Sequence, residues 1–116
     1  MTWKLTIGRE STGDIAVLRV EGRLGTASSG DLIGAVVGAI ESGDRRLLID
    51  LTGVDYVSSA GLLALDAASG RMHVAGGALV LCGLSEPVRL ALELSGLLPH
   101  FVVDASREEG LARLRT

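Results

Sequence analysis

The chain has 116 residues, of which 47% are hydrophobic, 22% charged and 3% aromatic, and its formal net charge is −3. This length predicts a single domain spanning residues 1–116, and the composition is typical of a folded globular protein rather than a disordered one. An acidic chain with so few aromatic rings lacks the clustered cations and stacking platforms that nucleic acids require, so a nucleic-acid interface is excluded.

The single cysteine and the hydropathy pattern indicate the compartment. Cys82 has no internal partner for a disulfide and lies in an apolar run, residues 78–82, which favours a small core residue. No apolar run reaches the ~18 residues that a membrane span needs, and the first four residues show no signal-peptide pattern. We therefore expect no membrane insertion and a cytoplasmic location.

The first two predicted elements form a hairpin. Residues 3–7 alternate apolar and polar side chains as a half-buried strand does, and residues 15–24 form a second strand. The polar segment between them, Gly8 to Asp14, is interpreted as the turn. The opening pair of strands should therefore be antiparallel.

A helix is predicted next. Cap-type residues at positions 25–31 precede apolar residues at helical spacing, which are Leu32, Ile33, Val36, Val37 and Ile40. Gly34 and Gly38 lie inside this helix, where glycine costs about 1 kcal/mol relative to alanine. We interpret them as sites of close packing against the sheet. Residues 42–44 end the helix.

The middle of the chain predicts a central strand followed by a second helix. Residues 47–51 are almost continuously apolar, which favours a strand covered on both faces. A polar turn then leads to a helix from about Ser59 to His73, with Leu62, Leu63, Leu65 and Met72 among its apolar positions. Asp50 and Asp55 are interpreted as a strand end and a turn residue, not as an acid–base pair.

The last third repeats the alternation of strand and helix. A strand at 78–82 is followed by a helix that opens at Glu86 and Pro87 and ends near Ser95 and Gly96. Its expected apolar positions are Val88, Leu90, Ala91, Leu92 and Leu94. A short strand at 101–103 precedes a last helix, which is capped by residues 104–106.

The resulting order, β-β-α-β-α-β-α-β-α, predicts an α/β fold with a mixed β-sheet. After the N-terminal antiparallel hairpin, strands and helices alternate, so the remaining strands should be parallel and joined by right-handed crossovers. About four helices should pack on this sheet.

Ser58 and Ser59 are the candidate functional residues, because they lie where the central strand leads into a helix. The first N–H groups of a helix lack intrahelical partners and carry the positive end of its dipole, so such a site suits a phosphate. The same serines also suit plain N-capping, a role that serine commonly has. The two roles are compatible.

Residues 50–62 read D-L-T-G-V-D-Y-V-S-S-A-G-L, which resembles the central motif of the STAS domains of bacterial anti-sigma factor antagonists. Two further segments are similar to that family. Residues 21–24, E-G-R-L, resemble the G-x-L ending of its second strand, and residues 88–97 resemble its V-x-x-x-L-x-x-x-G-L helix. The resemblance covers almost the whole chain and implies a STAS-like fold.

The resemblance also implies a switch. Ser59 would be the phosphoacceptor, with Ser58 as runner-up, since Ser58 stands where the family often has Asp. The partner would be a serine kinase of the GHKL class that is itself an anti-sigma factor, and a phosphatase would reset the switch. The implied partner-binding residues are Tyr56, Val57, Ser58, Ser59, Ala60, Gly61, Leu62, Gly25 and Thr26, with Gly25 in a place that is often acidic.

The sequence also bears on other functions. An interaction-only STAS module, such as a subunit of a lipid-transport ABC complex or a sensory scaffold, would use the same surface without phosphate. An esterase is disfavoured, because Val57 replaces the first glycine of G-x-S-x-G and only His73 and His100 could act as a base. No metal-binding or P-loop motif is present, so we expect no enzyme activity, metal or cofactor.

Overall fold

A computed structural model of the chain describes residues 4–116 and contains one five-stranded mixed sheet, in the order β1-β2-β3-β4-β5. Strands β1 (Leu5–Thr12) and β2 (Ile15–Leu24) pair antiparallel. Strands β3 (Arg46–Val57), β4 (Ala78–Cys82) and β5 (Val102–Asp104) continue the sheet in parallel. The predicted hairpin and mixed sheet are confirmed.

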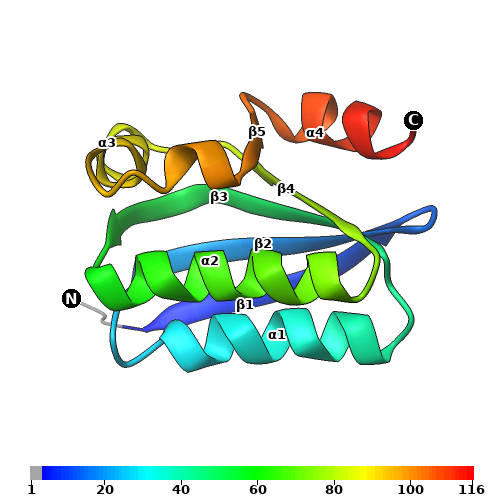
Figure 1. Cartoon of the computed structure of the whole chain (residues 1–116), viewed down its shortest axis with the longest axis horizontal. Coiled ribbons are helices and arrows are strands. Elements are labelled where there is room, and N and C mark those ends of the chain that lie inside the picture. The colour runs from blue at the N-terminus through cyan, green and yellow to red at the C-terminus, as the bar shows by residue number, and fades with distance from the viewer. Residues whose placement is uncertain (1–3) are drawn as a thin grey trace.

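The helices lie on both faces of the sheet. The described residues form α1 (Ser29–Glu41), α2 (Ser59–Val74), α3 (Glu86–Leu94) and α4 (Arg107–Leu114), with a short 3-10 turn, η1 (Leu98–His100), before β5. In Figure 1, α1 and α2 run side by side across one face, whereas α4 lies on the opposite face. No helix in residues 4–116 is both long and apolar enough to span a membrane.

The hairpin is longer than the sequence predicted. The sequence predicts a turn from Gly8 to Asp14, but residues 8–12 continue β1 and pair with residues 15–19 of β2. The chain reverses only at Gly13 and Asp14, where Gly13 has a φ of +62°. Polar residues are tolerated in this part of β1 because it is an edge strand. Trp3, predicted to begin the strand, lies outside the described residues.

Strand β3 also extends beyond its prediction. The polar stretch after Leu51 is not a turn, because Gly53, Val54, Tyr56 and Val57 pair with residues 21–24 of β2, with a register shift at Asp55. Since β4 pairs with β3 only as far as Asp50, the second half of β3 is bonded to one neighbouring strand and is partly exposed. Asp50 and Asp55 therefore lie within the strand, and neither ends it nor forms a turn.

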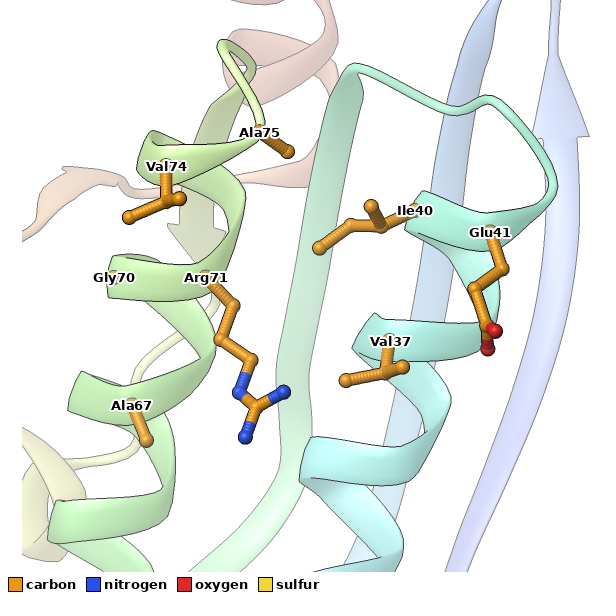
Figure 2. A pocket seen from close by; sticks show the side chains of 8 residues that line it. All are labelled: Val37, Ile40, Glu41, Ala67, Gly70, Arg71, Val74 and Ala75. Carbon is orange, nitrogen blue, oxygen red and sulfur yellow. The ribbon is translucent and has the colours of Figure 1, made fainter.

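The packing of α1, α2 and α3 differs from the prediction at several positions. A β-carbon built on Gly34 or Gly38 would meet nothing within 4 Å, so neither glycine permits close packing on the sheet. Leu63 on α2 is 64% exposed, and Leu90 and Leu94 on α3 are exposed as well. A groove of about 560 Å³ lies between the C-terminal halves of α1 and α2 (Figure 2).

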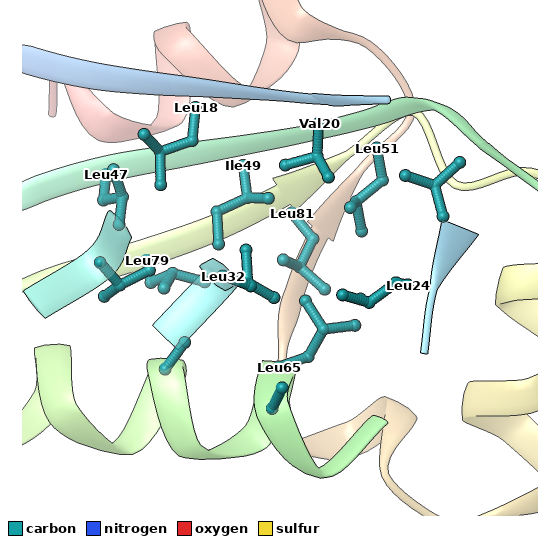
Figure 3. Close-up of a cluster of buried hydrophobic side chains, with 14 of the residues drawn as sticks. Leu18, Val20, Leu24, Leu32, Leu47, Ile49, Leu51, Leu65, Leu79 and Leu81 are labelled. Carbon is teal, nitrogen blue, oxygen red and sulfur yellow. The ribbon is translucent and has the colours of Figure 1, made fainter. Parts of the chain in front are cut away.

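Aliphatic side chains fill the core, as the low aromatic content predicts. Figure 3 shows the main cluster, between the sheet and α2, with Leu18, Ile49 and Leu81 facing Leu65. A smaller cluster lies between the sheet and α4, and its members are Ile15, Val17, Leu48, Val80, Cys82 and Leu114. Cys82 is buried there, as predicted, and burial raises the pKa of its thiol to about 12.

Arg107, in the first turn of α4, ties that helix to two strands. Its guanidinium donates to Asp50 Oδ2 from Nε at 3.2 Å and from Nη2 at 3.1 Å, and to Glu10 Oε1 from Nη1 at 3.3 Å. Thr52 donates to Asp50 Oδ1 from its backbone N at 3.0 Å and its hydroxyl at 2.6 Å. Burial alone would raise the pKa of Asp50, but these hydrogen bonds outweigh it and hold that pKa below its ordinary 3.8.

Candidate functional site

The two serines have different roles at the junction of β3 and α2. Ser58 is the N-cap of α2, and its Oγ accepts a hydrogen bond from the backbone N of Gly61 at 3.2 Å. Its own backbone N donates to the carbonyl oxygen of Leu24 at 3.0 Å. Ser59 is the first residue of α2 and is exposed, and its side chain makes no hydrogen bond to residues 4–116. Only Ser59 therefore presents a free hydroxyl.

Gly61 and Leu62 shape the junction from beneath and are both buried. A β-carbon on Gly61 would lie 2.4 Å from the carbonyl oxygen of Leu24 and 2.8 Å from Cγ2 of Val57. These distances are too short for any side chain, so glycine lets the first turn of α2 rest directly on β2. Of the residues that the resemblance implies bind a partner, these two are the ones that lie buried beneath the junction in the described structure.

The loop from β2 to α1 lies beside the serines and is ordered by Ser28. The buried Ser28 Oγ accepts from the backbone N of Gly25 at 3.0 Å and donates to the carbonyl oxygen of Arg23 at 2.8 Å. A β-carbon on Gly25 would lie 3.7 Å from both Ser58 Oγ and Tyr56 Cε2. The structure thus brings Gly25 next to Tyr56 and Ser58, although they are more than thirty positions apart.

Arg23 and Tyr56 complete the surface and are partners in the β2–β3 register. The Arg23 guanidinium carbon lies 3.9 Å from the centroid of the Tyr56 ring, within the range of a cation–π contact. Together with the loop they line a pocket of about 140 Å³, whose residues are Arg23, Gly25, Thr26, Ala27, Ser28 and Tyr56. The sequence did not identify Arg23 or Ser28, because the register that places them here is tertiary.

The charge near the start of α2 bears on the phosphate site that the sequence predicts. The first turn of α2 carries no acidic residue, so no carboxylate of that turn repels a dianion at Ser59. A base for hydrolysis is not supplied by His73, which is fourteen residues further along α2 and thus about 21 Å away along its axis. Within the described residues no three side chains form a metal-binding group.

Comparisons with known proteins agree with this architecture. BtrV of Bordetella bronchiseptica, described as a proposed anti-sigma factor antagonist, is 35% identical over 113 residues, which cover 97% of this chain and 96% of that protein. An anti-sigma factor antagonist from Mycobacterium paratuberculosis has a similar structure, with a TM-score of 0.87 and 22% identity over 97% of this chain and 96% of the other.

The phosphorylated form of the Bacillus cell fate determinant SpoIIAA is also similar, with a TM-score of 0.72 and 21% identity over 95% of this chain and 100% of that one. At such identities the two solved structures show a shared fold. The family model for the STAS domain matches residues 7–110. From this match and from the relative that is 35% identical along nearly its whole length, we conclude that the chain belongs to the STAS domain family.

Proposed function

We propose that this STAS domain is a cytoplasmic anti-sigma factor antagonist without enzyme activity of its own. Unphosphorylated, it binds an anti-sigma factor of the GHKL kinase class and thereby frees a sigma factor. Phosphorylation of Ser59 by that kinase dissociates the complex, and a phosphatase restores the unphosphorylated state. The observation that carries the proposal is the exposed Ser59 hydroxyl at the start of α2, in a chain that is 35% identical to BtrV.

The contacts of the two serines support Ser59 over Ser58 as the acceptor. In the transfer, Ser59 Oγ bonds to the γ-phosphorus of ATP, the bond to the bridging oxygen breaks, ADP leaves, and the hydroxyl proton passes to a base of the kinase. Ser58 Oγ is engaged by the backbone N of Gly61 and is only partly accessible. Modifying Ser58 would disrupt the cap of α2, whereas modifying Ser59 leaves the cap intact.

The physical effect of the phosphate supports an on–off switch. A phosphoserine adds about −1.5 to −2 charges, which the N-terminus of α2 stabilises while the group remains in water. A partner that covers Ser59 would have to remove water from this dianion, and burying an unpaired charge is costly. Binding is therefore lost while the domain stays folded.

The test uses the purified chain, ATP and GHKL-class kinases from the same cell. Mass spectrometry should find one added phosphate on the wild type and on Ser58→Ala, but none on Ser59→Ala. Calorimetry should show that Ser59→Ala binds the kinase like the wild type and that Ser59→Asp binds at least tenfold more weakly. Melting temperatures serve as the control, since both Ser59 variants should unfold like the wild type.

Two outcomes would contradict the proposal. If Ser59→Asp binds the kinase as tightly as the wild type, charge at this position does not control docking. If no phosphate appears in vitro or in cells and the chain co-purifies with the ATPase subunit of a transporter, it is an interaction-only STAS module.

A further inference from the structure

The outer face of α2 carries an apolar stripe, although it points away from the sheet. Its exposed stripe, repeating every three or four residues, consists of Leu63, Ala67, Gly70 and Val74. Leu63 is 64% and Val74 is 87% exposed. The inner face of α2 is equally apolar and lies in the core. A helix that is apolar on both sides is typical of a helix covered on both sides.

The apolar stripe borders the groove between α1 and α2. Figure 2 shows its walls, with Val37 and Ile40 on α1 opposite Ala67 and Gly70 on α2. The volume of about 560 Å³ is large enough for several side chains of a partner. The groove is open because its α2 wall is built mainly from small residues.

Two glycines on this face make no close packing contact within the described part of the chain. A β-carbon on Gly34 of α1 or on Gly70 of α2 would meet nothing within 4 Å. Glycine weakens a helix relative to alanine, and here no packing between residues 4–116 compensates for it. What glycine does provide is room for another backbone to approach the two helices closely.

Two opposite charges on the groove lack partners. Glu41 comes from α1 and Arg71 from α2, and neither side chain makes a hydrogen bond or ion pair with any residue from 4 to 116. Figure 2 shows Arg71 extending from α2 toward α1, whereas the side chain of Glu41 lies on the flank of α1 that faces away from α2. A surface with one unpaired charge of each sign, on different helices, is complementary to itself when rotated by a two-fold axis.

We propose that the outer face of the α1–α2 pair binds the same face of a second copy of this chain, forming a two-fold symmetric homodimer. Val74 of each copy enters the groove of the other, and Glu41 of each copy pairs with Arg71 of the other. The proposal does not depend on the proposed function, because its measurements use the chain alone, without kinase or phosphate.

The dimer should be weak. Helix α2 has 16 residues and is therefore about 24 Å long, so two such helix pairs in contact bury an area at the small end of the range for specific interfaces. Analytical ultracentrifugation should thus cover about 1 μM to 1 mM protein, the range in which interfaces of this size associate. The wild type should change from monomer to dimer within that range.

Charge exchange tests the pairing directly. Glu41→Arg and Arg71→Glu should each raise the dimer dissociation constant at least tenfold, because each brings like charges together twice. An equimolar mixture of the two variants should dimerise at least as tightly as the wild type, since both pairs are then restored in the heterodimer. Glu93→Arg, a charge reversal on the exposed surface of α3, is the matched control and should leave dimerisation unchanged.

Gly70→Ala separates an interface role from a structural one. It should raise the melting temperature by a few degrees while weakening the dimer, because a methyl group strengthens the helix and fills the approach path. A wild type that stays monomeric up to the highest concentration overturns the proposal. A dimer that forms equally well in all single variants also overturns it, since another surface then holds the two copies together.

Discussion

Two glycines of α2 provide the sharpest test of the site's construction, because the same substitution should have opposite effects on them. At Gly70, alanine adds a methyl group that meets nothing within 4 Å, so the helix gains about 1 kcal/mol. At Gly61 the same gain is opposed by a β-carbon 2.4 Å from the carbonyl oxygen of Leu24.

A β-carbon at Gly61 would destabilise the fold strongly, because the carbonyl oxygen of Leu24 cannot move without the backbone of β2. The Leu24 carbonyl also accepts the hydrogen bond from the backbone N of Ser58, so displacing it disturbs the start of α2. Overpacking costs about 1–3 kcal/mol, and contacts with backbone fall at or above the upper end. After the helix gain is subtracted, Gly61→Ala should lose about 2 kcal/mol, and the two variants should differ by about 3 kcal/mol.

Urea unfolding at low protein concentration measures this difference, with fluorescence or circular dichroism as the signal. With an m-value of about 1.5 kcal/mol/M, the two midpoints should lie about 2 M apart, with the wild type between them. Gly61→Ala should also be a poorer kinase substrate, since Ser59 is displaced with the helix. Equal midpoints for the two variants would refute the view that α2 is seated on β2 through Gly61.

Other predictions concern the cap, the α4 ion pair and the cysteine. Ser58→Ala should destabilise the fold by about 1 kcal/mol and Ser59→Ala by less than about 0.5 kcal/mol in chemical denaturation, because only Ser58 caps α2. The lowered pKa of Asp50 stabilises the fold above the ordinary pKa of 3.8, and this contribution is lost as the pH falls through the folded value. Asp50→Asn, which weakens the contact with Arg107, should therefore cost about 1–3 kcal/mol at pH 7 and should reduce the dependence of the free energy of unfolding on pH in the acid range. The Cys82 thiol, with its pKa raised to about 12, should not react with a disulfide reagent at pH 8 until the chain is unfolded in guanidinium.

The order of strands and helices was predictable because it depends on local patterns. Runs such as residues 47–51 and 78–82 are apolar enough to define strands without knowledge of their neighbours. The ends of strands were not predictable in this way. Residues 8–12 and 52–57 are polar and contain turn-type residues, and they are extended only because a partner strand lies beside them.

Which side chains are buried was predicted less well where an apolar residue occupies an exposed position. Leu63 is among the apolar positions predicted for this helix together with Leu62 and Leu65, but it is 64% exposed because its position on α2 points outward. At the site, the motif located Ser58 and Ser59 correctly at the junction. The contact of Arg23 with Tyr56 was missed, because it requires the β2–β3 register, which has a register shift just before Arg23.

The contact between Arg107 and Glu10 joins residues 97 positions apart, so it can form only once both ends of the domain have been made. Until then the aliphatic side chains of Ile15, Val17 and Leu48 have no cover on that face of the sheet. A chain that lacks the eight residues of α4 would expose this apolar surface to water. Exposed apolar surface of this kind makes incompletely folded chains prone to aggregation and binding by chaperones. Docking of α4 is therefore the step that covers this face of the sheet.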